Sequence, residues 1–492
     1  MNLIKLRATL YHTQADNPKV ILMTTTSNAP SPLAQKAHKC YQQGDFVKSI
    51  ALFKEALAEE PHSSILHQAL GNVYKAAGQL PDALQHYQES LKYNPHDWSC
   101  YYHIGLLYNK INEPTQAIAM FKRALDRAPG RIEVQSQLAQ TYALNDDLEN
   151  AIAHYECVLQ QKLEHPGALF NIGLLLSKRS RYSQALPYLE KAQTYYPEDP
   201  ELFFHLGLCS QHTQQNEVAR NYYRHTLTLA PQHGGANHNL GCLYLQIKEE
   251  ALALKHLQAS LAVMPHNVTA QYLVHALTQT NTPTEAPREY LRCLFNEYAA
   301  NYETHLFGTL KSQGPNEIRR MMGPIKARHL EPWRALDLGC GTGVCARYFH
   351  DIVDRLEGVD IAEEMIYIAK TTNAYEKLYT EDYMLTLAKN LGYHFIFGID
   401  TVIYVGDLRN LFKSVYGALA KEGYFAFTVE EAPAEVNFYR LNKTGRYQHN
   451  KDAIIALAES LDFKLIACDH IPLREQFGEW CMGFGMVFQK NG

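Results

Sequence analysis

Residues 336–343 read Leu-Asp-Leu-Gly-Cys-Gly-Thr-Gly, and this stretch decides the fold expected for the C-terminal part of the chain. Glycines occupy alternate positions after the apolar run, at Gly339, Gly341 and Gly343. Because glycine adopts left-handed backbone and lets a ligand approach the main chain, the pattern predicts a strand, a tight turn and a helix that begins near Val344. Residues 341–346 also fit the G-x-G-x-x-A pattern of dinucleotide sites, so the turn alone leaves two ligand classes open.

Strand-like and helical segments alternate around this turn. Strands are expected at 335–338, 356–360, 377–379, 395–399, 424–429, 464–468 and 482–488. Helical segments separate the first five, which predicts a doubly wound parallel sheet, and the last two predict an antiparallel edge. We therefore expect a Rossmann-like α/β domain with a seven-stranded, mostly parallel sheet. Ligands of such sheets bind beyond the carboxyl ends of the strands.

Two aspartates at strand ends favour one of the two ligand classes. Asp337 stands directly before the glycines, where a fixed carboxylate opposes a pyrophosphate but suits an ammonium group. Asp360 ends the second expected strand, where it can accept hydrogen bonds from two ribose hydroxyls. The pair favours a cationic, nucleoside-containing ligand over a nicotinamide dinucleotide.

Together with Glu381-Asp382 and the run Ile399-Asp400-Thr401-Val402-Ile403-Tyr404-Val405-Gly406-Asp407, these residues resemble the motifs of class I S-adenosylmethionine-dependent methyltransferases. The resemblance implies that S-adenosylmethionine is the cofactor. It implies a binding set of Asp337, Gly339, Gly341, Gly343, Asp360, Asp382 and Asp400. Asp382 is the residue we expect at the adenine amino group, with Glu381 as the alternative.

The same resemblance implies a helical lid over the pocket. Residues 289–310 carry apolar side chains at helical spacing, as expected for a helix that folds over the cofactor. We take Tyr298 as the lid residue that contacts the cofactor, with Tyr302 and His305 as further candidates. The alternative for these side chains is packing against the adjoining sheet.

Candidate catalytic residues follow from the chemistry of methyl transfer. The reaction is an in-line displacement, so alignment of the acceptor supplies much of the catalysis and a base is optional. The candidates that we expect near the strand ends are Asp400, Tyr404 and His449, with Glu430 beside them. His449 has the most suitable ordinary pKa. The alternative for Asp400 is to cap the following helix.

The N-terminal half repeats with a period of 34 residues. The repeat marks are Pro61, Pro95, Pro129, Leu163, Pro197, Pro231 and Pro265. Small residues follow ten positions later, at Gly71, Gly105, Ala139, Gly173, Gly207 and Gly241. Aromatic residues such as Phe53, Tyr87, Phe121, Tyr155 and Tyr223 are expected to fill the space over them.

Each unit reads as a helix, a tight turn and a second helix. In one unit the helices are expected at 65–77 and 81–93, with Gly78 ending the first. The pattern resembles the tetratricopeptide repeat, with seven units over residues 30–265 and a capping helix at 268–279. The resemblance implies an all-α solenoid whose concave groove binds a protein or a peptide. Residues 441–449 and 473–475 resemble stretches of predicted bacterial methyltransferases that carry such repeats.

A series of polar residues precedes the small residues by two positions in five consecutive units. They are His103, Gln137, Asn171, His205 and Asn239. Because amides and imidazoles both donate and accept hydrogen bonds, this ladder is a candidate grip for the backbone of an extended peptide. The alternative is that these side chains are solvated or bond locally between repeats.

Composition sets the remaining expectations. The chain has 492 residues, a net charge of -5 and no block of basic residues, so neither nucleic acid nor a membrane is an expected partner. Ten scattered cysteines predict reduced thiols and no metal site. We expect a cytoplasmic protein with a disordered tail over 1–29, repeats over 30–279, a linker over 280–288 and the α/β domain over 289–492. Met23 is a second candidate start.

The whole pattern predicts an enzyme whose repeats recruit a protein or peptide partner for methylation. Two alternatives stay open. One is a small-molecule methyltransferase whose repeats mediate assembly. The other is a repeat scaffold whose cofactor-binding domain does not react.

Overall fold

The computed structural model describes residues 31–280, 282–476 and 479–492, so the tail expected over 1–29 lies outside the described residues. Contacts divide the chain into two compact units, one up to Pro231 and one from Gln232 onward. Each unit is described by itself. No helix of the described ranges is long and apolar enough to cross a bilayer.

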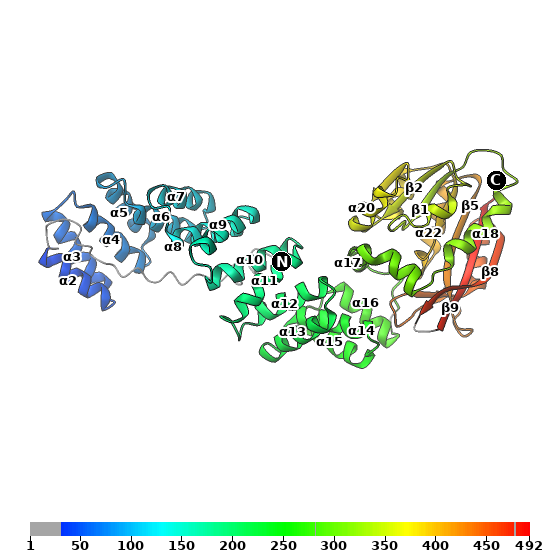
Figure 1. Cartoon of the computed structure of the whole chain (residues 1–492), viewed down its shortest axis with the longest axis horizontal. Helices are drawn as coiled ribbons and strands as arrows, with labels where there is room; N and C mark the ends of the chain where they lie inside the picture. The colour runs from blue at the N-terminus through cyan, green and yellow to red at the C-terminus, as the bar shows by residue number, and fades with distance from the viewer. Residues whose placement is uncertain (1–30, 281, 477–478) are drawn as a thin grey trace. The chain divides into compact units, whose positions relative to one another are not determined.

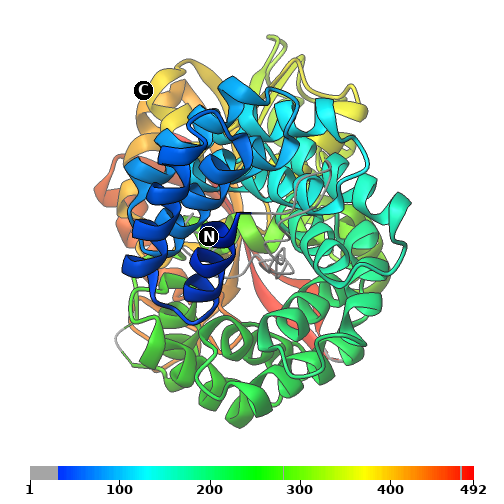
Figure 2. The same cartoon turned by 90° about the vertical axis from the view of Figure 1, so that its left-hand side faces the viewer.

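The first unit consists of helices that pack in consecutive pairs (Figures 1 and 2). Their bounds are α2 Pro32–Gln42, α3 Phe46–Glu59, α4 Ser64–Ala76, α5 Leu80–Tyr93, α6 Trp98–Lys110, α7 Pro114–Arg127, α8 Ile132–Leu144, α9 Leu148–Gln161, α10 Pro166–Lys178, α11 Tyr182–Gln193, α12 Pro200–His212 and α13 Asn216–Leu229. Figure 2 shows these pairs following one another along a curve. The helix–turn–helix repeats predicted here are confirmed.

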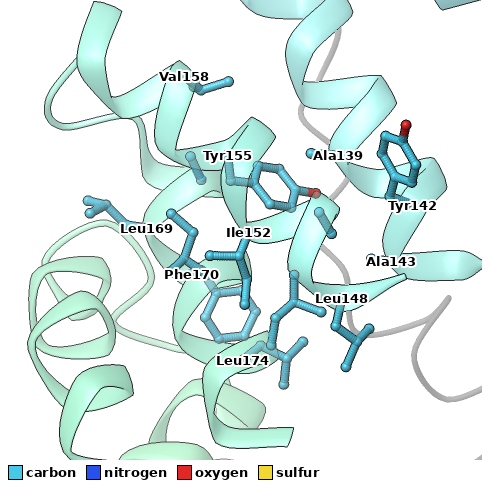
Figure 3. Packing of buried hydrophobic residues seen from close by; sticks show 14 of the residues in the cluster. Ala139, Tyr142, Ala143, Leu148, Ile152, Tyr155, Val158, Leu169, Phe170 and Leu174 are labelled. Carbon is cyan, nitrogen blue, oxygen red and sulfur yellow. The ribbon is translucent and has the colours of Figure 1, made fainter. Parts of the chain in front are cut away.

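Small residues let the two helices of a pair approach closely. A Cβ atom on Gly105 would lie 2.6 Å from the Phe121 ring, and one on Gly207 would lie equally close to Tyr223. Figure 3 shows the Tyr155 ring pointing toward Ala139 within the buried cluster of this unit. The predicted packing of large side chains over small residues is therefore confirmed.

The turn inside each pair uses left-handed backbone at one fixed position. Two of these positions carry glycine, Gly44 and Gly78, with φ of 80° and 77°. The later pairs of the first unit have positive φ at Asn112, Asp146, Ser180 and Gln214. The left-handed turn is therefore part of each of these repeats even where the residue is not glycine. Among residues other than glycine, Asn and Asp adopt this conformation at the lowest cost.

The second unit begins with the seventh helix pair and the capping helix. These are α14 Gly234–Gln246, α15 Glu250–Val263 and α16 Val268–Thr278. Gln279 ends α16 in the left-handed region, with φ of 57°. Helix α17, Arg288–Tyr298, follows, then one 3-10 turn at Ala299–Asn301 and one π turn at Thr304–Thr309. The helix expected over 289–310 is therefore present in broken form.

A sheet of nine strands forms the centre of this unit. The strands are β1 Arg334–Leu338, β2 Arg355–Asp360, β3 Lys377–Thr380, β4 Tyr393–Gly398, β5 Leu419–Glu431, β6 Tyr439–Leu441, β7 Tyr447–His449, β8 Phe463–Gln476 and β9 Glu479–Lys490. The order is β3-β2-β1-β4-β5-β7-β6, with β9 pairing antiparallel to both β5 and β8 (Figure 1).

All seven expected strands are present, but the expected count of seven is corrected by β6 and β7. These two strands form a short antiparallel hairpin, and β7 pairs in parallel with the end of β5. Each has three residues, too few for an alternating pattern to be recognised in the sequence. The hairpin lies at the carboxyl end of β5, where ligands of such sheets bind.

Helices cover both faces of the sheet. Helices α18 Gly314–Lys326 and α19 Ala346–Phe349 pack on one face through Met322, Phe349 and Phe397. The other face carries α21 Tyr383–Lys389, α22 Arg409–Ala418 and α23 Lys451–Ser460. Helix α20, Glu363–Thr371, follows β2 and contacts α17. The strand ends of β1, β2, β3 and β4 remain open to a ligand at one edge.

Candidate active site

The glycine turn after β1 has the conformation predicted for it. Gly339, Gly341 and Gly343 have φ of 67°, 55° and 87°, a region that side chains disfavour. The amides of Gly339 and Cys340 both donate to the Val359 carbonyl of β2, at 2.8 and 3.0 Å. The following helix α19 begins at Ala346 and has only four residues, later and shorter than expected.

Asp360 holds this turn from the end of β2. Its two carboxylate oxygens accept hydrogen bonds from the amides of Gly341 and Ala362, each at 2.9 Å. The side chain is 9% exposed and lines the cavity described below. Burial raises the pKa of Asp360, while the amide hydrogen bonds act in the opposite direction.

Asp337 lies behind the turn. Its side chain is 1% exposed, and one carboxylate oxygen accepts the Tyr375 hydroxyl hydrogen bond at 2.8 Å. Burial raises the pKa of Asp337 to about 7. Asp337 is not among the residues that line the cavity, so the structure does not bring it where sequence reasoning expected it.

The lid places Tyr302 over the glycine turn. A Cβ on Gly341 would lie 3.4 Å from the Tyr302 ring, and Phe295 packs edge-on to that ring. Both residues line the cavity. Tyr298, the residue expected to contact the cofactor, instead packs against His305 at a ring distance of 5.6 Å. Tyr302 takes the expected position of Tyr298 over the glycine turn, because the α-helix ends at Tyr298 and is followed by the 3-10 turn and the π turn.

Polar contacts fix the lid to the sheet domain. The Asn296 amide donates to Glu363 at 3.0 Å, and its oxygen accepts the Glu364 amide at the same distance. Arg288 forms an ion pair with Asp382 at 2.5 Å. The Asp382 side chain also caps α21 through the Met384 amide. Asp382 and the neighbouring Glu381 both line the cavity, as predicted for this strand end.

Asp400 follows β4 with left-handed backbone, at φ of 55°. One carboxylate oxygen accepts the Ser312 hydroxyl at 3.1 Å, and the other lies 3.5 Å from Arg474. Arg474 is 2% exposed and also pairs with buried Glu430. Arg474 is therefore part of a buried cluster of two carboxylates and one guanidinium.

Tyr404 closes the cavity between the lid and the loop after β4. Its ring is edge-on to Phe295 at 5.5 Å, and Tyr404 interacts electrostatically with Arg446. The Tyr404 carbonyl accepts the Ala286 amide at 2.9 Å. Both Asp400 and Tyr404 line the cavity, so the structure brings these two candidate catalytic residues together.

His449 does not reach the cavity. The ring is 2% exposed, and its Nε2 atom lies 3.2 Å from the Gly406 carbonyl. Burial lowers the pKa of His449 to about 4, so the ring is neutral at neutral pH. The expectation that His449 acts as a base is not supported by this position, because β7 directs the ring into the protein interior.

The cavity encloses about 770 Å³ of empty space, including its open mouth. Five carboxylates line it, from Glu285, Asp360, Glu381, Asp382 and Asp400. Arg288 is the single cationic side chain among the described residues of its wall. A wall of this charge suits a cationic ligand and opposes a pyrophosphate. Within the described ranges, no group of His, Cys, Asp and Glu has the geometry of a metal site.

Several functional residues were not identified from the sequence. Arg288, Ser312 and Tyr375 contact Asp382, Asp400 and Asp337, respectively, across separations that leave no periodic signal. Tyr375 lies 38 positions from Asp337, and Ser312 lies 88 positions from Asp400. The apolar spacing of the lid did indicate Tyr302, although it did not distinguish Tyr302 from Tyr298.

The polar ladder of the repeats is largely buried. His103 stacks on Tyr87 and accepts from Lys75 at 3.2 Å. Asn171 donates to the Tyr155 hydroxyl at 2.9 Å, and His205 lies 3.3 Å from Ser177. The remaining members, Gln137 and Asn239, are buried and half-buried. Local bonds between helices are therefore present, and peptide binding by the ladder stays a prediction.

Comparison with known families finds two kinds of domain in the chain. A family model described as a methyltransferase domain matches residues 290–472. Three models of the tetratricopeptide repeat match residues 41–104, 99–131 and 170–234. The chain also matches tetratricopeptide repeat protein 8 of Caenorhabditis elegans and protein O-mannosyl-transferase TMTC3 of Homo sapiens, each at 27% identity over 126 residues.

These matches are partial. They cover 25% of this chain, 25% of the worm protein and 14% of the human protein. Among solved structures, YrrB, described as having an unusual peptide-binding site, is 22% identical. It covers 38% of this chain and 96% of its own, with a TM-score of 0.35. A repeat protein of Cytophaga hutchinsonii is 16% identical over 48% of this chain and 97% of its own, with a TM-score of 0.41.

The family models and the two kinds of fold agree along the chain. Helix pairs occupy the regions matched by the repeat models, and the nine-stranded sheet occupies the region matched by the methyltransferase model. The chain is therefore a fusion of tetratricopeptide repeats with a methyltransferase domain.

Proposed function

We propose that the C-terminal domain is a class I, S-adenosylmethionine-dependent methyltransferase and that the repeats recruit a protein or peptide partner to it. The methyltransferase family match supports the reaction type. The open parallel strand ends with a glycine turn support a nucleoside ligand at this edge.

The carboxylate-rich wall of the cavity is the observation that supports S-adenosylmethionine as the cofactor. Five carboxylates and one arginine line the described cavity, together with the positive-φ glycines Gly339 and Gly341. A sulfonium and an ammonium group fit such a wall, whereas the pyrophosphate of a nicotinamide dinucleotide does not. Helix α19 has only four residues, whereas dinucleotide sites hold the pyrophosphate at the start of a longer helix.

Each cavity residue has a separate proposed role. Asp360, held by two backbone amides, is placed to accept hydrogen bonds from ribose hydroxyls. Asp382 or Glu381 is placed to recognise the adenine amino group, and Tyr302 covers the glycine turn. Asp337 is assigned a supporting role, because it lies behind the turn and bonds to Tyr375.

When bound, S-adenosylmethionine supplies an electrophilic methyl group on a sulfonium. The chain then needs chiefly to orient the acceptor and exclude water. Phe295 and Tyr302 provide apolar cover from the lid. Asp400 and Tyr404 are the polar groups that can hold an acceptor hydrogen, and Asp400 can accept a proton from an amine or a hydroxyl.

A labelling experiment tests this function. The full chain is incubated with methyl-labelled S-adenosylmethionine and host-cell extract, and the label is separated by molecular size. We expect label in protein, and we expect Asp360→Ala to abolish it. Label only in small metabolites would instead favour the small-molecule alternative. Cofactor binding without any transfer would favour the non-reacting scaffold.

The recruiting role of the repeats has its own test. Asn239→Ala changes a half-buried ladder member, whereas Gln246→Ala changes a residue beyond the ladder at the end of α14. If the ladder grips a peptide, Asn239→Ala weakens partner binding and the control does not. Equal partner binding by both variants would remove the ladder from the proposal.

A further inference from the structure

The tip of the β6–β7 hairpin, residues 442–446, contacts the last helices of the repeat region. The Tyr272 hydroxyl of α16 donates to the Gly445 carbonyl at 2.9 Å. The Tyr272 ring is 1% exposed and packs near the rings of Tyr290 and Tyr447. Lys443 adds an ion pair with Glu250 at 2.7 Å. The hairpin is thus held by a repeat and not only by its own sheet.

The inner side of the same tip reaches the cavity through a buried polar cluster. The Asn442 amide donates to Glu430 at 2.8 Å, and its oxygen accepts the Arg446 amide at 3.2 Å. Glu430 pairs with Arg474, which pairs with Asp400 in the cavity wall. An unbroken series of contacts therefore runs from Tyr272 through the tip to Asp400.

Arg446 supplies a second branch. It follows Gly445 directly and interacts electrostatically with Tyr404, the other polar candidate in the cavity wall. Gly445 has φ of 77°, and a Cβ there would lie 3.1 Å from the Tyr290 hydroxyl. The tip has little room to shift, so the position of Arg446 depends on what holds Gly445.

Residues 283–286 make a second connection between α16 and the loop that carries Tyr404. The Thr284 carbonyl accepts the amides of Gly406 and Asp407, at 2.8 and 2.9 Å. Glu285 pairs with Val405 as an isolated antiparallel bridge. The Tyr447 hydroxyl of the hairpin donates to the Pro283 carbonyl at 2.9 Å. The segment expected to be a linker is, in its described part, a strap bonded to the cavity loop.

We propose that Tyr272 of the capping helix α16 is a positioning residue for Asp400 and Tyr404, acting through the hairpin tip 442–446. The capping helix then belongs to the methyl-transfer site as a structural part, in addition to any partner that the repeats recruit. This inference rests on the proposed function only where the cavity is treated as the site of methyl transfer. The contacts themselves do not depend on the identity of the cofactor.

The test uses the full chain and a matched pair of tyrosine variants. Tyr272→Phe removes the hydroxyl that donates to Gly445 and keeps the ring. Tyr244→Phe is the control, because Tyr244 lies in α14 of the same unit and its ring stacks on His256. Amide hydrogen exchange is measured by mass spectrometry for the tip 442–446, the cavity loop 402–407 and helix α22. S-adenosylmethionine affinity is measured on the same samples.

We expect Tyr272→Phe to speed exchange at the tip and at the cavity loop about tenfold, as the loss of one buried hydrogen bond of about 1.4 kcal/mol would. We expect α22 and the Tyr244→Phe control to change less than about twofold, since the network does not pass through them. We expect the cofactor affinity to change as little, because Asp360 and the glycine turn lie outside the network. Unchanged exchange at 402–407 would overturn the proposal. Faster exchange throughout the second unit, α22 included, would also overturn it, because it indicates a general structural role.

A second variant covers the case in which Tyr272→Phe does not fold. Asn442→Ala breaks the tip on the side of Glu430 and leaves α16 intact. The same acceleration at 402–407, with α22 unchanged, supports the proposal, and an unchanged loop contradicts it. Absence of S-adenosylmethionine binding by the wild type would count against the proposed function alone, because the exchange data are read without it.

Discussion

The Asp360 carboxylate accepts the Gly341 amide hydrogen bond at 2.9 Å, which joins the end of β2 to the turn after β1. The second oxygen is held in the same way by Ala362. These two bonds fix the orientation of the carboxylate, which lines the cavity and keeps lone pairs for further hydrogen bonds.

Replacing this carboxylate by an amide should weaken cofactor binding. Asp360→Asn keeps the size of the side chain but removes its charge, and hydrogen bonds to a charged group contribute about 1.5–3 kcal/mol. We expect the dissociation constant of S-adenosylmethionine to rise by roughly 10- to 100-fold in calorimetric titration. Asp351→Asn, at a partly exposed ion pair with Arg319, is the control. Equal affinities for the two variants would remove Asp360 from the site.

Adding one methyl group at Gly341 should also weaken binding. Gly341 has φ of 55°, and the new Cβ would lie 3.4 Å from the Tyr302 ring, in the space below the lid. Gly417→Ala adds the same group in open space on α22. We expect Gly341→Ala to lose at least about tenfold in cofactor affinity, or about 1.4 kcal/mol, and Gly417→Ala to lose none. A fully active Gly341→Ala protein would contradict the close approach of a ligand to this turn.

In the repeats, a small residue beneath an aromatic ring should be required for stability. A Cβ on Gly105 would lie within 3 Å of three Phe121 ring atoms, whereas one on Gly130 meets nothing within 4 Å. We expect Gly105→Ala to destabilise the first unit by about 1–3 kcal/mol through overpacking. Gly130→Ala should be nearly neutral. Urea unfolding followed by circular dichroism compares the stability of the two variants. Equal unfolding midpoints would show that the helix pair has room for the added methyl group.

Asp337 should make stability depend on pH. Burial raises its pKa from 3.8 to about 7 in the folded chain, so the folded state retains a proton that the unfolded state has released. Folding stability from this group is therefore lost as pH rises toward 7. Asp337→Asn has no such loss, and its stability relative to wild type should improve by up to about 3 kcal/mol between pH 5 and pH 8. Urea unfolding at the two pH values measures this difference, and a constant difference would mean that Asp337 is ionised throughout.

Much of the fold was predictable because local patterns encode it. The seven expected strands and the 34-residue repeat follow from periodicity and glycine positions such as Gly78 and Gly339, which act within a few residues. The β6–β7 hairpin was not predicted, because strands of three residues carry no alternating pattern. The family match over 290–472 agrees with what the glycine turn and Asp360 indicated.

The site was predicted less completely, because side-chain positions depend on residues distant in the chain. Arg474 is buried by Glu430, 44 positions earlier, and nothing near Arg474 in the sequence signals that pairing. His449 has a suitable ordinary pKa, but burial beside Gly406 removes it from the cavity and lowers that pKa to about 4. Residue type alone indicated which groups are able to react and not which of them reach the cavity.

Titration of the full chain with S-adenosylmethionine and, separately, with oxidised nicotinamide adenine dinucleotide tests the central claim most directly. The carboxylate-rich wall and the glycine turn held by Asp360 predict saturable binding of one S-adenosylmethionine per chain and no measurable heat with the dinucleotide. Binding of the dinucleotide, or a wild-type chain that binds no S-adenosylmethionine, would contradict the account.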